Sequence, residues 1–144
     1  MQALIIDTDP GVDDAMAIAF ALAHPDLELL ALTTVFGNVS VEQATQNALS
    51  ILDYLGAEHI PVAAGAAIPI EQKPLPHPDF VHGADGLGNI NLPQSGRQAH
   101  SLSAAEFIVK SANDRPGEIS LVAIGPMTNV QLALQIDPLS LIHI

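Results

Sequence analysis

Residues 3–35 read ALIIDTDPGVDDAMAIAFALAHPDLELLALTTV, and this stretch decides the fold. Its first four residues form a short apolar run that is typical of a buried strand. A helical pattern follows from Asp13 and should end before Pro25. Residues 27–35 are a second apolar run of strand length. A strand, a helix and a second strand in this order predict a βαβ unit with parallel strands.

The rest of the chain repeats this alternation. Capping-box patterns that begin at Ser40 and Ser103 predict two further helices. Further strands are expected at residues 60–64 and 119–124. A last helix is expected at residues 128–137.

Alternating strands and helices predict an α/β fold: an open, mostly parallel sheet with helices on both faces. Ligands of such folds bind outside the carboxyl ends of the strands. Residues 65–100 carry five prolines and show no sustained periodicity. Long segments of this kind in a compact domain are usually functional, so a functional loop is expected there.

Composition narrows the class of protein. The length of 144 residues suits one domain, and 49% of the residues are hydrophobic, enough for a core. Sixteen acids against four bases give a formal net charge of -12, which disfavours nucleic acid and anionic membranes as partners and favours a cation. With no cysteine, thiolate chemistry is excluded. No basic, apolar leader and no membrane-spanning run is evident, so a cytoplasmic location is expected.

Four carboxylates stand within eight residues where the first strand ends and the first helix begins: Asp7, Asp9, Asp13 and Asp14. The proline–glycine turn between the two pairs is expected to fold them towards each other. Ca²⁺ and Mg²⁺ prefer hard oxygen ligands of this kind. The last two acids also suit a helix N-terminus, where they cap the helix and face its dipole. Capping does not explain the first two, so the segment predicts a metal or catalytic site.

Three other interpretations of this segment can be weighed. An EF-hand loop that begins at Asp7 would need an acid at its twelfth position, where Ile18 stands. A Mg²⁺-dependent phosphotransferase of the haloacid-dehalogenase type, with Asp7 as nucleophile, remains the alternative enzyme. A non-catalytic module that binds ribose or a nucleoside is the non-enzymatic alternative.

The segment at residues 7–15, DTDPGVDDA, resembles the N-terminal signature of the inosine-uridine preferring nucleoside hydrolase family. Residues 33–38 (TTVFGN), 81–88 (VHGADGLG) and 124–129 (IGPMTN) resemble the second, third and fourth blocks of that family. The resemblance implies a Rossmann-like nucleoside hydrolase fold, hydrolysis of the N-glycosidic bond of ribonucleosides, calcium as cofactor, and a homodimer or homotetramer.

The resemblance also implies roles for single residues at the metal. Asp9 matches the carboxylate that both binds Ca²⁺ and acts as general base for the attacking water. Asp14 matches a calcium ligand, and Ile124 matches a position whose backbone carbonyl binds calcium. Asp7 is part of the signature and is expected to orient the loop from behind the metal ligands.

For the substrate, the resemblance implies ribose contacts from Asp13 and Asn38. His82 lies in the third block and is expected to sit near the substrate. Thr128 and Asn129, in the fourth block, are interpreted as cap and first-turn residues of the last helix.

Family members are longer than this chain. Residues 1–144 are therefore interpreted as the N-terminal portion of a single nucleoside hydrolase domain whose C-terminal half is missing, and the isolated chain is expected to be inactive or nearly so. The sequence leaves open the preferred base, the leaving-group acid, the remaining calcium ligand and ribose contacts, and whether residues 138–144 are native.

Overall fold

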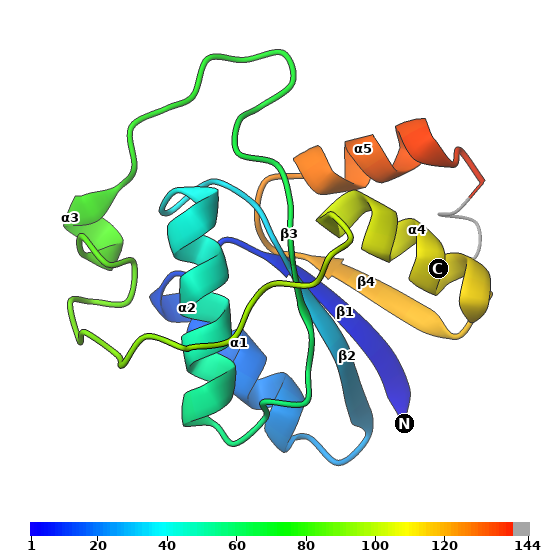
Figure 1. The fold of residues 1–144 in the computed structure, drawn as a ribbon, viewed down its shortest axis with the longest axis horizontal. Helices are drawn as coiled ribbons and strands as arrows, with labels where there is room; N and C mark the ends of the chain where they lie inside the picture. The colour runs from blue at the N-terminus through cyan, green and yellow to red at the C-terminus, as the bar shows by residue number, and fades with distance from the viewer. Residues whose placement is uncertain (140–144) are drawn as a thin grey trace.

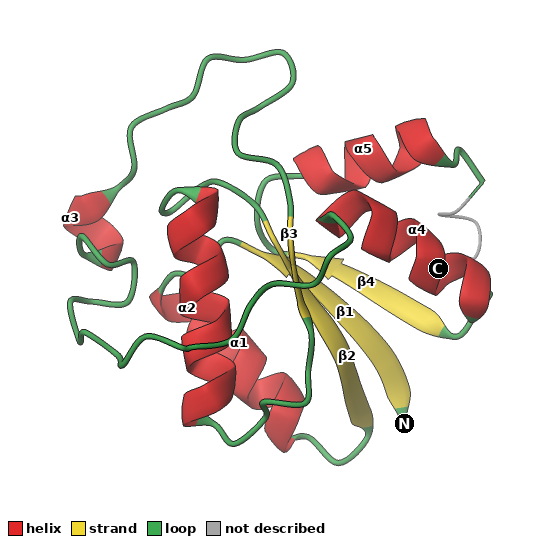
Figure 2. Cartoon of the chain, viewed as in Figure 1, coloured by secondary structure: helices red, strands yellow, loops and turns green. Residues whose placement is uncertain are grey.

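The computed structural model describes residues 1–139 and confirms the α/β fold. Its sheet has the strand order β3-β2-β1-β4, and every pairing is parallel (Figures 1 and 2). The strands are β1 (Gln2–Thr8), β2 (Leu27–Thr34), β3 (Val62–Ala64) and β4 (Ile119–Ala123). The helices are α1 (Val12–Ala23), α2 (Val41–Tyr54), α3 (Asp79–His82), α4 (Ala104–Asp114) and α5 (Thr128–Ile136).

Every strand and helix expected from the sequence is present, and α3 is an additional short helix in the long loop. Of residues 138–144, only Pro138 and Leu139 are among the described residues. Within residues 1–139, no helix combines the length and the apolar character needed to cross a bilayer.

Helices cover both faces of the sheet, as predicted (Figure 2). Side chains of a strand alternate between its two faces. Leu4 and Ile6 of β1 pack with α1 and α2 in the larger core cluster. Ala3 and Ile5 point to the other face, where Phe107 of α4 packs against the same cluster. The aliphatic composition therefore fills two thin cores, one on each side of the sheet.

The same alternation separates two polar residues at the carboxyl end of β1. Thr8 faces α1, where its hydroxyl donates to Asp14 Oδ1 over 2.5 Å. Asp7 faces α5, where its Oδ1 accepts from Asn129 Nδ2 over 2.8 Å. Asp7 and Thr8, neighbours in β1, thus make contacts on opposite faces of the sheet, at the edge where ligands of such folds bind.

The two predicted capping boxes differ. Ser103 and Glu106 form both reciprocal hydrogen bonds at the start of α4. Ser40 accepts from the backbone N–H of Gln43 at the start of α2, but the Gln43 side chain donates to Asn47 instead of completing the box. The predicted capping box at Ser40 was therefore only half right, because the Gln43 side chain binds Asn47, one helical turn later, instead of the Ser40 N–H.

The long segment after β3 crosses the carboxyl edge of the sheet before it returns to α4 (Figure 1). Asp85 organises its middle by accepting hydrogen bonds from three backbone N–H groups: Leu87, Asn89 and Asn91. Arg97 then fixes the return path, since its guanidinium donates to Asp53 Oδ1 over 3.0 Å and to the carbonyl oxygen of Ile60. The segment is held by polar contacts because it has little regular structure of its own.

Candidate active site

Asp9 lies one residue beyond β1, and its side chain is buried, with only 5% of the residue exposed. Its Oδ2 accepts a hydrogen bond from the backbone N–H of Asn38 over 2.7 Å. Two glycines make room for the carboxylate. A Cβ on Gly37 would lie 1.9 Å from Asp9 Oδ2, and one on Gly125 would lie 2.8 Å from Oδ1. The turns after β2 and β4 therefore enclose this carboxylate from two sides.

Burial raises the pKa of Asp9 from its ordinary value of 3.8 to about 7. The hydrogen bond from the Asn38 N–H opposes this shift, whereas the negative charges of Asp14 and Asp13 add to it. A nearby cation would reverse the balance by favouring the charged carboxylate. The position therefore suits an acid that either exchanges a proton or binds a metal.

Asp14 lies on the same side of the sheet edge. Its Oδ1 accepts from the Thr8 hydroxyl, and its Oδ2 accepts from the backbone N–H of Gly11 over 3.1 Å. Asp14 therefore caps α1, as its position in the sequence suggests. The Asn38 side chain joins the two acids, because its Nδ2 donates to Asp14 Oδ2 over 3.3 Å and to the carbonyl oxygen of Asp9 over 3.1 Å.

Asp7 does not join this pair, so the expectation that the turn folds all the acids together was wrong. Its side chain is fully buried on the α5 face, where Oδ1 accepts from the Thr33 hydroxyl over 2.6 Å and from Asn129 Nδ2 over 2.8 Å. Its Oδ2 has no hydrogen-bond partner among the described residues. Burial raises the pKa of Asp7 to about 6, against the opposing effect of the two hydrogen bonds. Strand alternation separates Asp7 from Asp14, because Asp14 bonds to Thr8 on the α1 face, whereas Asp9 lies beyond the end of β1.

Asp13 and His82 meet at the N-terminus of α1. The Asp13 side chain is 83% exposed, and its Oδ1 lies 3.8 Å from His82 Nδ1. The same ring nitrogen accepts a hydrogen bond from the backbone N–H of Val12 over 3.4 Å. A Cβ on Gly11 would lie 2.7 Å from both His82 Nδ1 and Asn38 Nδ2, so these two side chains border the same turn.

Ile124 follows β4 and reaches the same edge through its backbone. Its N–H donates to the carbonyl oxygen of Asp7 over 2.9 Å, and the N–H of Gly125 donates to that oxygen over 3.2 Å. The structure therefore brings Asp9, Asp14 and the Ile124 backbone to one end of the sheet.

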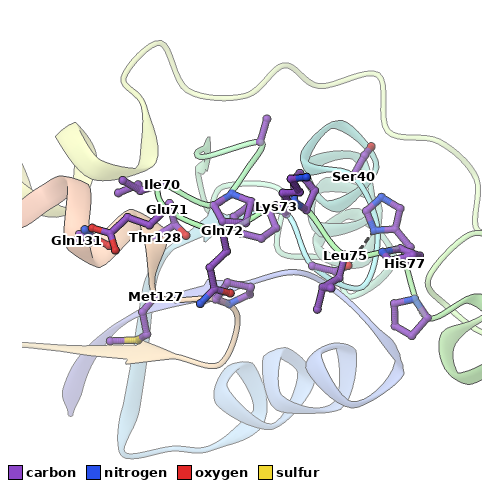
Figure 3. A pocket seen from close by; sticks show the side chains of 18 residues that line it. Ser40, Ile70, Glu71, Gln72, Lys73, Leu75, His77, Met127, Thr128 and Gln131 are labelled. Atoms are coloured by element: carbon purple, nitrogen blue, oxygen red, sulfur yellow. Dashed lines mark hydrogen bonds between the residues drawn. The ribbon is translucent and has the colours of Figure 1, made fainter.

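A cavity of roughly 700 Å³ lies between loop 66–78 and the start of α5 (Figure 3). Its volume is that of a typical small-molecule site. Gly37 connects the cavity to Asp9, because Gly37 lines the cavity and a Cβ at its position would lie 1.9 Å from Asp9 Oδ2. The Gly37 carbonyl oxygen also lies 2.9 Å from His77 Nδ1. Neither Asp9 nor Asp14 lines the cavity itself. Side chains from the loop, from α5 and from the residue before α5 line it, among them Ile70, Glu71, Lys73, Leu75, Met127 and Gln131.

The sequence missed the role of Asn129. Thr128 is the first residue of α5 and not its cap, because Met127 holds the N-cap position, so the expected cap was wrong, whereas Asn129 does lie in the first turn. Its buried side chain binds Asp7, the Thr34 carbonyl oxygen and the Ala66 N–H. A polar residue at the start of a helix is usually a cap, and no local pattern reveals partners so far away in the chain.

The donor set can be compared with the metal that the resemblance implies. Within residues 1–139, no three His, Cys, Asp or Glu side chains form a ready metal-binding group. Two carboxylates, Asp9 and Asp14, lie together at the sheet edge with the Ile124 backbone nearby. These are hard oxygen donors, which fit Ca²⁺ or Mg²⁺ and do not fit a thiophilic metal.

Among residues 1–139, no lysine or arginine forms an ion pair with Asp9 or Asp14. The lysine and arginine side chains that form ion pairs bind Asp53, Asp114, Glu28 and Glu118.

Comparison with known proteins identifies the family. Residues 4–144 match the model of the inosine-uridine preferring nucleoside hydrolases. The chain is 48% identical to uridine nucleosidase 1 of Arabidopsis thaliana over 136 residues, which are 94% of this chain and 40% of the relative. It is 44% identical to a non-specific ribonucleoside hydrolase of Escherichia coli over 94% of this chain and 44% of the relative. The chain thus spans less than half the length of these relatives.

A solved structure agrees with this assignment. The purine-preferring ribonucleoside hydrolase from Gardnerella vaginalis superposes with a TM-score of 0.94 at 36% identity, over 99% of this chain and 46% of that protein. The acidic turn, the Asn38 loop and the Ile124 turn meet at the carboxyl edge of this sheet. The chain belongs to the inosine-uridine preferring nucleoside hydrolase family.

Proposed function

We propose that the protein hydrolyses the N-glycosidic bond of ribonucleosides to free base and ribose at the carboxyl edge of the sheet, with Asp9 as general base. The observation that carries this proposal is the placement of Asp9. Its carboxylate is enclosed by Gly37 and Gly125 and shares the Asn38 side chain with Asp14. The names of the relatives, uridine nucleosidase and ribonucleoside hydrolase, support the reaction.

The chemistry requires a negative, ordered environment. As the water oxygen bonds to ribose C1′, the bond from C1′ to the base nitrogen breaks, and the electron pair of that bond leaves with the base. The transition state resembles an oxocarbenium ion, whose positive charge nearby carboxylates stabilise. Asp9 takes the proton from the water, a contribution of typically ~10²–10⁴-fold in rate.

We propose Ca²⁺ as the cofactor, held by Asp9, Asp14 and the backbone carbonyl of Ile124. Among residues 1–139, no lysine or arginine forms an ion pair with either acid, which supports this assignment. When bound, calcium would orient ribose hydroxyls and water and stabilise developing negative charge. Asp7 does not bind the metal in this proposal; its backbone carbonyl oxygen accepts hydrogen bonds from the Ile124 and Gly125 N–H groups and so orients that turn.

The substrate contacts are proposed beside Asp9 and Asp14. The Asn38 side chain already donates to Asp9 and Asp14, and its amide oxygen, which has no partner among the described residues, can accept from a ribose hydroxyl. Asp13 is exposed, so its carboxylate can accept from a second hydroxyl. His82, beside Asp13, is proposed to border the nucleoside. Deoxyribose would be rejected, because polar groups of the site would lose their partners.

The alternative phosphotransferase has no support in the geometry. Its nucleophile would be Asp7, whose side chain is fully buried between Thr33 and Asn129. A carboxylate in that position cannot reach a phosphate ester without opening the sheet edge. The non-catalytic binding module remains as an outcome of the test below.

Two further proposals rest on the sequence and the family. Homo-oligomerisation as a dimer or tetramer and a cytoplasmic location stay predictions. The same holds for the low activity of residues 1–144 by themselves, which we expect because the chain spans only 40% of the uridine nucleosidase it matches.

Ribose release from inosine and from uridine tests the proposal in a chain that includes the full family length. Release that needs calcium, stops with chelator and disappears in Asp9→Ala is the expected result. Binding of nucleoside without release, by a folded and calcium-loaded protein, would identify a non-catalytic module. Where ribose is released, the ratio of the release rates from inosine and from uridine shows which base the protein prefers.

A further inference from the structure

Asn129 is the second residue of α5, and only 1% of it is exposed. Its Nδ2 donates to Asp7 Oδ1 over 2.8 Å and to the carbonyl oxygen of Thr34 over 2.9 Å. Its Oδ1 accepts from the backbone N–H of Ala66 over 2.9 Å. Both kinds of atom in the amide therefore have partners, and each partner belongs to a different segment of the fold.

These partners mark the carboxyl ends of three neighbouring strands. Asp7 lies in β1, Thr34 ends β2, and Ala66 follows β3. The partners are 122, 95 and 63 residues away from Asn129 in the chain. One side chain thus fixes the relative positions of three strand ends at the edge that carries the site.

Asp7 extends this connection to the fourth strand. Its backbone carbonyl oxygen accepts from the N–H groups of Ile124 and Gly125, which follow β4. Gly125 is one of the two glycines that enclose Asp9. A continuous chain of contacts therefore runs from Asn129 through Asp7 to the turn beside the Asp9 carboxylate.

The space around the Asn129 amide is closely fitted. A Cβ on Gly65 would lie 2.2 Å from Asn129 Oδ1 and 2.5 Å from the carbonyl oxygen of Thr34. The backbone after β3 therefore approaches the amide as closely as a glycine allows. A side chain that lacks the amide group would leave the Thr34 carbonyl and the Ala66 N–H buried without partners.

We propose that Asn129 is a positioning residue for the hydrolytic site, which through Asp7 holds the Ile124–Gly125 turn where Asp9 requires it. This inference rests on the proposed function, because Asp9 is the base of that reaction. Asn129 does not line the cavity, and its side chain hydrogen-bonds to Asp7 and to the backbone of Thr34 and Ala66, so it acts through Asp7 and the backbone. Since a misplacement of ~1 Å can lower a rate by about 100-fold, its loss should reduce kcat more than it changes KM.

The test compares Asn129→Leu with a matched control, Thr45→Val, in a chain extended to the full family length. Thr45 also makes a buried hydrogen bond at the end of β2, to the Thr34 hydroxyl over 2.7 Å, but on the α2 side of the sheet. The first readout is the state of the Gly125 backbone amide, monitored by its nuclear magnetic resonance chemical shift and by its hydrogen-exchange rate. The second is the pair of kcat and KM for inosine.

Asn129→Leu is expected to move the Gly125 amide signal, to speed its exchange about tenfold, and to lower kcat about tenfold or more with little change in KM. Thr45→Val should leave both readouts unchanged even where it lowers thermal stability. If Asn129→Leu does not fold, Asn129→Ser, which also removes the bond to Asp7 Oδ1, is measured in the same way.

An unchanged Gly125 amide and an unchanged kcat in a folded Asn129 variant would overturn the proposal. Equal losses in the Thr45→Val control would also overturn it, because the effect would then be one of general stability. Should the wild-type protein not hydrolyse nucleosides, the proposed function fails by itself, and the Gly125 amide still decides whether Asn129 holds the turn.

Discussion

Asn38 holds Asp9 with both its backbone and its side chain. The Asn38 N–H donates to Asp9 Oδ2 over 2.7 Å, and the Asn38 Nδ2 donates to the Asp9 carbonyl oxygen over 3.1 Å. The same Nδ2 reaches Asp14. A residue that follows β2 thus orients two acids that follow β1, which parallel strands make possible because their carboxyl ends meet at one edge.

The first prediction concerns this side chain. Asn38→Ala keeps the N–H bond to Asp9 but removes the amide, so we expect the free energy of unfolding to fall by about 1 kcal/mol. Looser placement of Asp9 and loss of a ribose contact should together lower kcat/KM for inosine about tenfold or more. Urea denaturation and ribose release measure the two effects. Unchanged kcat/KM would show that the side chain neither orients Asp9 nor binds ribose.

The second prediction uses the glycines around Asp9. In Gly37→Ala the new Cβ would lie 1.9 Å from Asp9 Oδ2, so the carboxylate must move. We expect a loss of about 1–3 kcal/mol in stability from overpacking and a weaker calcium affinity by calorimetry. Gly96→Ala is the matched control, because nothing lies within 4 Å of its Cβ position. If both variants bind calcium with the wild-type affinity, the close approach of Gly37 to the Asp9 carboxylate does not affect metal binding.

Much of this fold could be predicted from the sequence because its signals are local. The apolar run before Asp7 and the helical pattern after it define β1 and α1 within a few residues of their bounds. The proline at position 25 ends α1 as expected, since α1 stops at Ala23. The position of Asp9 and Asp14 at the carboxyl edge follows from the same strand–turn–helix order.

What the sequence could not show depends on contacts between distant residues. The burial of Asp7 follows from the alternation of β1, but its partner Asn129 stands 122 residues later. The bond between His77 and the Gly37 carbonyl is likewise set by the path of loop 66–78, which has no periodicity to read. Such contacts come from tertiary packing, which short-range patterns do not encode.

The third prediction concerns pH in metal-free protein. The pKa of Asp9 is raised to about 7 and that of Asp7 to about 6, from 3.8. The folded state therefore binds protons more tightly than the unfolded state, so these groups stabilise the fold below about pH 4. That contribution is lost as pH rises through 6 to 7.

Urea unfolding with chelator at pH 5 and pH 8 measures this loss. The wild type should lose stability relative to Asp9→Asn as pH rises, because the variant cannot carry the Asp9 charge. A difference between the two proteins that does not vary with pH would contradict the raised pKa.

The fourth prediction tests His82. Its Nδ1 lies at the N-terminus of α1, 3.8 Å from Asp13 Oδ1. Loss of one hydrogen bond to substrate is worth about 0.5–1.5 kcal/mol, so His82→Ala should raise KM for nucleosides several-fold while calcium affinity stays unchanged. His59→Ala, at an exposed site, serves as control. An unaltered KM in His82→Ala would remove His82 from the substrate site.

The central claim is that Asp9 is the base of a ribonucleoside hydrolase. The most direct measurement is kcat for inosine and uridine in Asp9→Asn, at full family length and with calcium occupancy verified by calorimetry. The amide keeps an oxygen that can bind calcium but cannot take the proton from water. Asp9→Asn is expected to have a kcat lower by about 10²–10⁴-fold at saturating calcium. Ribose release by Asp9→Asn near the wild-type rate would contradict the claim that Asp9 is the base.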